Sequence, residues 1–151
     1  MLTFLAFIVA IALLIAVHEF GHYRVAVACG VKVLRFSIGF GKPLLRWQSR
    51  ASGTEFVVAL FPLGGFVKML DEREAPVAPG ERHLAFNTQS LGPRCAIVAA
   101  GPAANLLLAV LLYCVVNWTG VQLPAAIMAQ PTPDSLAGQA GLVGGERVVR
   151  A

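Results

Sequence analysis

Charged side chains are scarce in this chain. Among its 151 residues, 12 are Lys or Arg and 8 are Asp or Glu, so that 13% are charged while 57% are hydrophobic. Soluble globular domains average about 25% charged and about 45–50% apolar residues. Together with a mean hydropathy of +0.72, this composition argues against a water-soluble globule. It also excludes intrinsic disorder, which needs low hydrophobicity.

Cysteine is rare as well. Cys29, Cys95 and Cys114 lie far apart, and an odd number without clustered spacing does not indicate a disulfide framework. We expect all three to be small buried hydrophobic residues. The net charge of +4 is modest, and no nucleic-acid-binding motif accompanies the basic residues. We therefore expect no nucleic-acid partner.

Residues 1–29 are predicted to form a transmembrane helix. No charged side chain occurs in residues 1–17, the apolar character then resumes up to Cys29, and Gly30 is a typical helix stop. Such a helix would be about 43 Å long at about 1.5 Å per residue, which exceeds the hydrocarbon core of about 30 Å. A signal peptide fits poorly, because no Lys or Arg precedes the apolar run.

A second transmembrane helix is predicted over residues 95–119. No Asp, Glu, Lys, Arg or His occurs from Cys95 through Pro133. Pro102 suits either the first turn of a helix or a kink within one, and Trp118 suits an interfacial anchor. Residues 24–94 contain ten of the twelve Lys and Arg residues. The positive-inside rule therefore places residues 30–94 in the cytoplasm, and the N-terminus and residues 120–151 on the other side.

The first apolar run contains the motif His18-Glu19-Phe20-Gly21-His22. Residues four apart on a helix share one face, so His18 and His22 can bind one Zn²⁺, while Glu19 lies beside the ion as a general base. Charges inside a membrane helix are costly and usually functional. The alternative is a polar contact between helices or a position at the membrane edge. Gly21 would allow a second helix to approach closely.

A third zinc ligand is missing from the apolar segments. A catalytic zinc uses three protein ligands and a water, whereas Asp71, His83, Asp134 and the glutamates of residues 30–94 lie in polar stretches. The chain ends after an apolar pair, Val148-Val149, which is typical of the middle of a domain. We therefore expect a truncated chain that is inactive by itself.

Several segments together resemble the bacterial site-2 protease family of intramembrane zinc metalloproteases. The combination is more specific than His18–His22 alone. The matching segments are His18–His22, Arg35–Gly41, Pro62–Met69, Ala85–Asn87 and Gly101–Asn105.

The resemblance implies a multi-pass protein of the inner membrane. Family members take a third zinc ligand, an Asp, from a later membrane helix, and they cut membrane-spanning substrates such as anti-sigma factors. They also carry PDZ domains outside the cytoplasm. Residues from Pro133 onward are similar to the opening of such a domain, although Glu146 stands where the family more often has Asp.

The segment between the helices is predicted to form a set of β-hairpins that dips toward His18. Gly and Pro residues separate its short runs rich in Val, Phe, Leu and Ile. Gly64, Gly65 and Phe66 are expected to bind an extended substrate by β-augmentation, unless the glycines only make a turn. The apolar runs are residues 33–38, 44–48, 55–61 and 66–70.

The predicted fold class is therefore membrane α-helical, with a hairpin-rich loop between two transmembrane helices and the start of a PDZ domain. Asn105 either lies near the site as a hydrogen-bonding group or satisfies the helix start after Pro102. Besides a zinc endopeptidase in the lipid bilayer, two functions stay open. One is a non-catalytic membrane scaffold with an incomplete metal site. The other is a metal transporter, which would need more polar residues in the second span.

Overall fold

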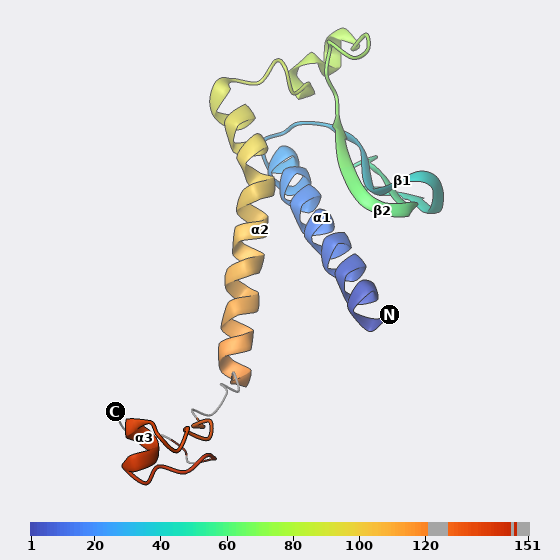
Figure 1. Ribbon diagram of the computed structural model, residues 1–151. Helices are drawn as coiled ribbons and strands as arrows, with labels where there is room; N and C mark the ends of the chain where they lie inside the picture. The colour runs from blue at the N-terminus through green and yellow to red at the C-terminus, as the bar shows by residue number, and fades with distance from the viewer. Residues whose placement is uncertain (121–126, 146, 148–151) are drawn as a thin grey trace. The chain divides into compact units, whose positions relative to one another are not determined.

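The computed structural model describes residues 1–120, 127–145 and 147 of the chain. It comprises two compact units, Met1–Tyr113 and Cys114–Ala151. The elements follow one another as α1 (Leu2–Ala28), β1 (Val33–Gln48), β2 (Glu55–Met69), the 3-10 helix η1 (Pro79–Leu84), α2 (Leu91–Thr119) and α3 (Leu136–Gln139) (Figure 1).

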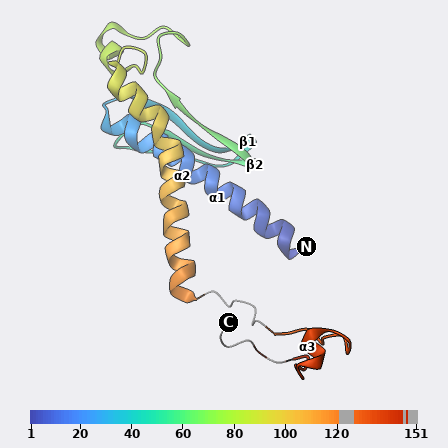
Figure 2. The same cartoon turned by 60° about the vertical axis from the view of Figure 1, so that its left-hand side comes forward.

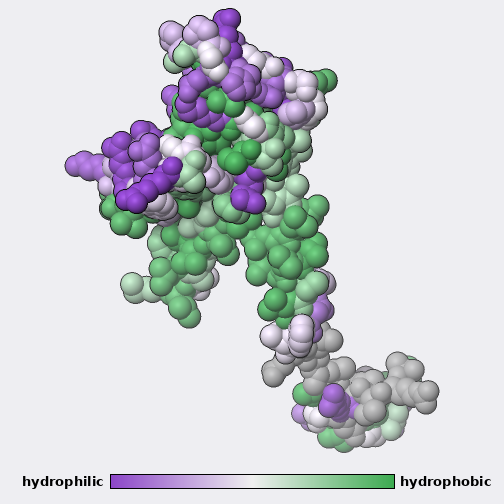
Figure 3. Space-filling model, turned by 180° about the vertical axis from the view of Figure 1, so that it is seen from behind, coloured by the Kyte–Doolittle hydropathy of each residue, from purple (hydrophilic) through white to green (hydrophobic). Residues whose placement is uncertain are grey.

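The two long helices are both long and apolar enough to cross a membrane. This confirms the predicted arrangement of two apolar helices on either side of a β segment. Helix α1 ends as expected, because Gly30 adopts a φ of 78°, which side chains disfavour. Helix α2 begins at Leu91, earlier than the predicted Cys95, because Pro93 fits a first helical turn. Figure 3 shows hydrophobic side chains over both helices and hydrophilic ones over the segment between them.

The expected burial of the cysteines is wrong for two of them. Cys95 and Cys114 are exposed and Cys29 is half-buried, and all three are free thiols. The physical reason is that the surface of α2 is itself apolar, with Leu106 and Leu111 more than 60% exposed. Such a surface suits lipid, so an apolar residue there needs no protein around it.

One antiparallel two-stranded sheet replaces the expected set of short hairpins. The runs around Gly39 and Gly41 belong to a single strand, β1, in which both glycines have a φ near 90°. Glycine at such a φ produces bulges and bends, so these residues curve β1 and do not end it. As a result, Phe36 pairs with both Phe56 and Val67 of β2. Figure 2 shows the long curved ribbons of this sheet.

A small core joins the end of α1 to the start of β1 and to α2. Its buried members are Ala26, Val31, Val33 and Ile97. Ile97 is only 1% exposed, although the rest of α2 is largely exposed. The core therefore anchors this part of α2 to α1 close to the predicted site.

The polar segment after β2 is held by ion pairs. Arg73 bonds both carboxylate oxygens of Asp71, at 2.9 and 2.5 Å, and Arg82 pairs with Glu72 at 2.6 Å. The hydrogen bond from Arg73 lowers the pKa of Asp71 below its ordinary value, against a smaller opposite effect of burial. This segment is ordered by its own charges as it leads from β2 to α2.

The second unit contains the short helix α3, which begins after Ser135. The hydroxyl of Ser135 accepts a hydrogen bond from the Gly138 N–H at 3.1 Å, an ordinary N-cap. Ile127 and Arg147 form an isolated antiparallel bridge. Glu146, Val148 and Val149, which entered the PDZ prediction, lie outside the described residues.

Candidate metal and catalytic site

The imidazoles of His18 and His22 converge on one point. They project from successive turns of α1, and their Nε2 atoms are 3.2 Å apart. Two nitrogens bound to one tetrahedral zinc at about 2.0–2.1 Å would lie about 3.3 Å apart. The spacing predicted from the motif therefore gives a geometry that suits two ligands of one ion.

Helix α2 contacts the other nitrogen of each ring. His22 Nδ1 donates a hydrogen bond to the Ile97 carbonyl oxygen at 2.7 Å. His18 Nδ1 lies 3.4 Å from the amide nitrogen of Asn105. Neither contact uses an Nε2 atom, and the two Nε2 atoms face each other at hydrogen-bond distance. Asn105 thus lies close to His18, which agrees with its predicted position near the site and not with the alternative of satisfying the helix start after Pro102.

Two glycines let the helices come this close. A Cβ atom at Gly21 would lie 2.5 Å from the Ala100 carbonyl oxygen and 2.8 Å from Ala104 Cβ. This confirms that Gly21 serves close helix approach. A Cβ atom at Gly101 would lie 2.7 Å from His18 Nε2 and would also meet His22 Nε2. The space at Gly101 is therefore the space next to both free nitrogens.

Glu19 lies on the other side of α1, against β2. A Cβ atom at Gly65 would lie 2.9 Å from Glu19 Cγ and 3.2 Å from Ile15 Cγ2. Gly65 therefore contacts the motif, as predicted for the β segment, whereas a Cβ atom at Gly64 would meet the ring of Phe40. A cavity of about 310 Å³ lies at this junction and is lined by Leu14, Ile15, His18, Glu19, Gly64, Gly65 and Asn105.

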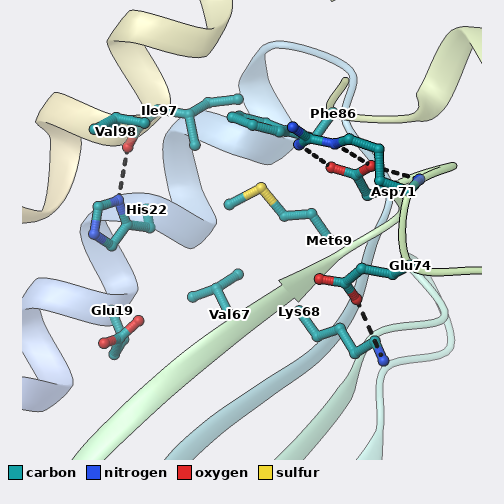
Figure 4. A pocket seen from close by; sticks show the side chains of 11 residues that line it. Glu19, His22, Val67, Lys68, Met69, Asp71, Glu74, Phe86, Ile97 and Val98 are labelled. Carbon is teal, nitrogen blue, oxygen red and sulfur yellow. Dashed lines mark hydrogen bonds and ion pairs between the residues drawn. The ribbon is translucent and has the colours of Figure 1, made fainter. Parts of the chain in front are cut away.

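A second cavity of about 370 Å³ borders Glu19 and His22 from the side of the polar segment (Figure 4). Its lining combines an apolar wall, which includes Val67, Met69 and Ile97, with several charged residues. These include Lys68 and Glu74, whose charged groups are 3.5 Å apart. Glu19 thus borders two cavities, one of which contains charged side chains suited to water.

Phe66 lies on the strand face opposite to that of Gly65, the face that Gly64 also presents to Phe40. Successive strand residues point to opposite faces, so Phe66 points away from Glu19 and stacks on Phe40 with ring centroids 6.5 Å apart. Gly101 and the Ile97 carbonyl belong to the site but were not predicted from the sequence. The one sequence signal for Gly101 is its position four residues, or one helical turn, before Asn105.

The residues present suit zinc but do not complete its coordination. Two imidazoles, a glycine-lined space and a neighbouring carboxylate fit a catalytic zinc, which needs one more protein ligand. In residues 1–120, 127–145 and 147, no group of three or more His, Cys, Asp or Glu side chains gathers around one point. The described part of the chain therefore supplies two ligands and a base.

Comparison with known proteins extends the likeness across the chain. Residues 6–140 match the model of peptidase family M50. Over 140 residues the chain is 54% identical to the regulator of sigma-E protease RseP of Salmonella typhimurium, covering 93% of the chain and 31% of that protein. Identity to RseP of Escherichia coli is 52% over 149 residues, which are 96% of the chain and 33% of the relative.

A third relative carries the metal in its name. The Ralstonia nicotianae protein RSc1411, described as a zinc metalloprotease, is 51% identical over 156 residues, covering 99% of the chain and 34% of the relative. The chain thus spans about a third of the length of these curated relatives.

Proposed function

Because the chain belongs to peptidase family M50, we propose that it provides part of the active site of an intramembrane zinc endopeptidase. The observation that carries the proposal is the convergence of His18 Nε2 and His22 Nε2, which lie 3.2 Å apart. Glu19 is the next residue after His18 on the same helix. In this proposal His18 and His22 bind Zn²⁺ and a further ligand comes from outside the described residues.

Glu19 is the proposed general base. Zinc held by imidazoles supplies a water molecule whose pKa is near 7. With zinc bound, the Glu19 carboxylate would accept the proton that the attacking water loses and would deliver it to the nitrogen of the leaving amine as the peptide bond breaks. The position of Glu19 supports this role, since it borders both the cavity lined by His18 and the cavity lined by His22.

The proposed substrate is a membrane-spanning segment held in extended form. A helix hides its peptide groups in hydrogen bonds, so it must unwind before it can be cut. Gly65 pairs with Ile38 on one edge, and no other strand of the described residues pairs with its opposite edge. A substrate strand added there by β-augmentation would lie next to Glu19.

The proposed location is the inner membrane. Helices α1 and α2 would cross the bilayer, and the many basic residues between them support a cytoplasmic location for residues 30–94. Two relatives are named regulator of sigma-E protease, which supports a membrane-bound regulator resembling an anti-sigma factor as the substrate. We further propose that the segment after Pro133 opens a PDZ domain outside the cytoplasm.

Substitution Glu19→Gln in the protein at its full encoded length tests the function. Cleavage of a membrane-spanning reporter should fall about 10²–10⁴-fold, the usual contribution of a general base, while bound zinc stays at the wild-type level. The 151-residue chain alone should cleave nothing, because its described residues supply only two of three ligands. Unchanged cleavage by the Glu19→Gln protein would contradict the proposal.

A non-catalytic membrane scaffold is the second candidate. The observation in its favour is that the described residues hold only two metal ligands. A scaffold would keep its binding partners in the Glu19→Gln variant and would lose no measurable hydrolysis. The same experiment therefore separates the two functions.

A further inference from the structure

We propose that one face of α2, formed by Ile97, Gly101 and Asn105, is the supporting wall of the zinc site and sets both histidines for metal binding. The inference rests on the proposed function. The three residues are spaced four apart, so they lie on the same side of the helix. Each of them contacts His18 or His22.

Ile97 holds the ring of His22. A carbonyl oxygen can only accept a hydrogen bond, so the 2.7 Å contact requires a proton on His22 Nδ1. A neutral imidazole then has its lone pair on Nε2. This arrangement, in which a metal-binding histidine donates its other N–H to a backbone carbonyl, is common in metal sites.

Asn105 does the same for His18 with its side chain. If His18 Nε2 binds a metal, Nδ1 carries the proton and needs an acceptor. The Asn105 side-chain oxygen is buried and has no hydrogen-bond partner among the described residues, while the amide nitrogen lies 3.4 Å from His18 Nδ1. A half-turn of the amide group exchanges these two atoms. It would bring the side-chain oxygen to His18 Nδ1 as the acceptor that this nitrogen needs, and it would move the amide nitrogen to the position that the oxygen leaves.

Gly101 supplies the space for the ion between these two contacts. Its missing side chain would meet Nε2 of both histidines. Gly92, in the first turn of the same helix, has no atom within 4 Å of the corresponding position. The Gly92→Ala substitution therefore adds the same methyl group to α2 at an exposed position that nothing faces, which makes it a suitable control.

Zinc affinity measures these roles directly. The protein at its full encoded length is purified in detergent, and its zinc dissociation constant is measured by competition with a chelator. The Asn105→Leu substitution should weaken zinc binding about 10–100-fold, as loss of an outer-shell partner usually does. The Asn105→Asp substitution should keep zinc binding within about 10-fold of wild type, because a carboxylate also accepts from His18 Nδ1.

The glycine pair tests the space. The Gly101→Ala substitution should lower zinc affinity by at least about 10-fold, whereas Gly92→Ala should leave it unchanged. Thermal unfolding of both variants shows whether each is folded. If Gly101→Ala does not fold, the Asn105 pair decides alone.

Two results would overturn the inference. One is wild-type zinc affinity in both Asn105→Leu and folded Gly101→Ala. The other is an equal loss in Asn105→Asp and Asn105→Leu, since an amide that donates to His18 or merely packs against it would give that pattern. If the wild type binds zinc and the Glu19→Gln protein loses cleavage, the proposed function remains supported even when one of these two results is found. A wild-type protein that contains no zinc would contradict both this inference and the proposed function.

Discussion

The two sides of α1 face different neighbours at the same helical turn. On one side, His18 and His22 face α2, where small residues and polar groups bring the helices into close contact. On the other side, Glu19 packs closely against Gly65 of β2, and both residues line one cavity. In Figure 1, α1 correspondingly lies between α2 and the sheet.

This difference separates two tasks. The side toward α2 holds the rings of His18 and His22 in place, and the missing side chain of Gly101 leaves a small space beside them that suits an ion. The side toward β2 has a strand edge that pairs with no other strand of the described residues, and such an edge suits a polypeptide. Changes to one side should therefore affect metal binding, and changes to the other should affect cleavage without loss of metal.

Gly65→Ala should have the largest effect among the changes that test this separation. The added methyl group would lie 2.8 Å from the Ser37 carbonyl oxygen and 2.9 Å from Glu19 Cγ, so Glu19 or the strand must shift. A displacement of about 1 Å can cost about 100-fold in rate. We expect cleavage of a membrane-spanning reporter to fall by about this factor while zinc content stays constant.

The matched control for this prediction is Gly80→Ala, because no atom lies within 4 Å of a Cβ at that position. Loss of zinc in Gly65→Ala would show that the two sides of α1 are not independent. Full activity would show that the strand at Gly65 has no part in cleavage.

Gly21→Ala should have an intermediate effect on the side toward α2. Its methyl group would overlap the Ala100 carbonyl oxygen and Ala104 Cβ, and such overpacking typically costs about 1–3 kcal/mol. Thermal unfolding in detergent should show the loss of stability, and zinc binding should weaken with it. Stability equal to that of Gly92→Ala would mean that the helices are not in close contact at Gly21.

Asp71 should give the smallest effect, although it lines the polar part of the cavity that borders Glu19 and His22. Because its pKa is lowered in the folded protein from an ordinary value of 3.8, its contribution to stability is complete above that value and disappears as pH falls through the folded pKa. An ion pair with an exposed Arg73 contributes little to stability, because solvent and salt screen it. Asp71→Asn should thus slightly reduce stability at pH 7, and the difference from wild type should vanish well below pH 4.

Stability curves against pH for Asp71→Asn and wild type check this prediction. Asp134→Asn, in the second unit, is a suitable control. A difference that persists unchanged at low pH would show that the carboxylate charge is not responsible.

The helices and the histidine pair could be predicted from local pattern alone. Long uncharged runs and the stop at Gly30 set the limits of α1, and a spacing of four residues on a helix places His18 and His22 together. The sheet was harder, because Gly39 and Gly41 are typical of turns. In the structure they bend β1 without ending it, an outcome that depends on pairing with β2.

The support from α2 could not be predicted from the sequence. Gly101 and Ile97 matter because of atoms about 75–80 residues away, and no local pattern records such contacts. The burial predicted for Cys95 and Cys114 failed for a related reason, since an apolar side chain on a membrane helix can face lipid as well as protein.

The zinc content of the protein at its full encoded length, purified in detergent, tests the central claim most directly. Zinc per chain should be measured for the wild type and for His18→Ala and His22→Ala. We expect about one zinc per wild-type chain and almost none in either variant. A wild-type protein that contains no zinc, or variants that retain it fully, would contradict the account.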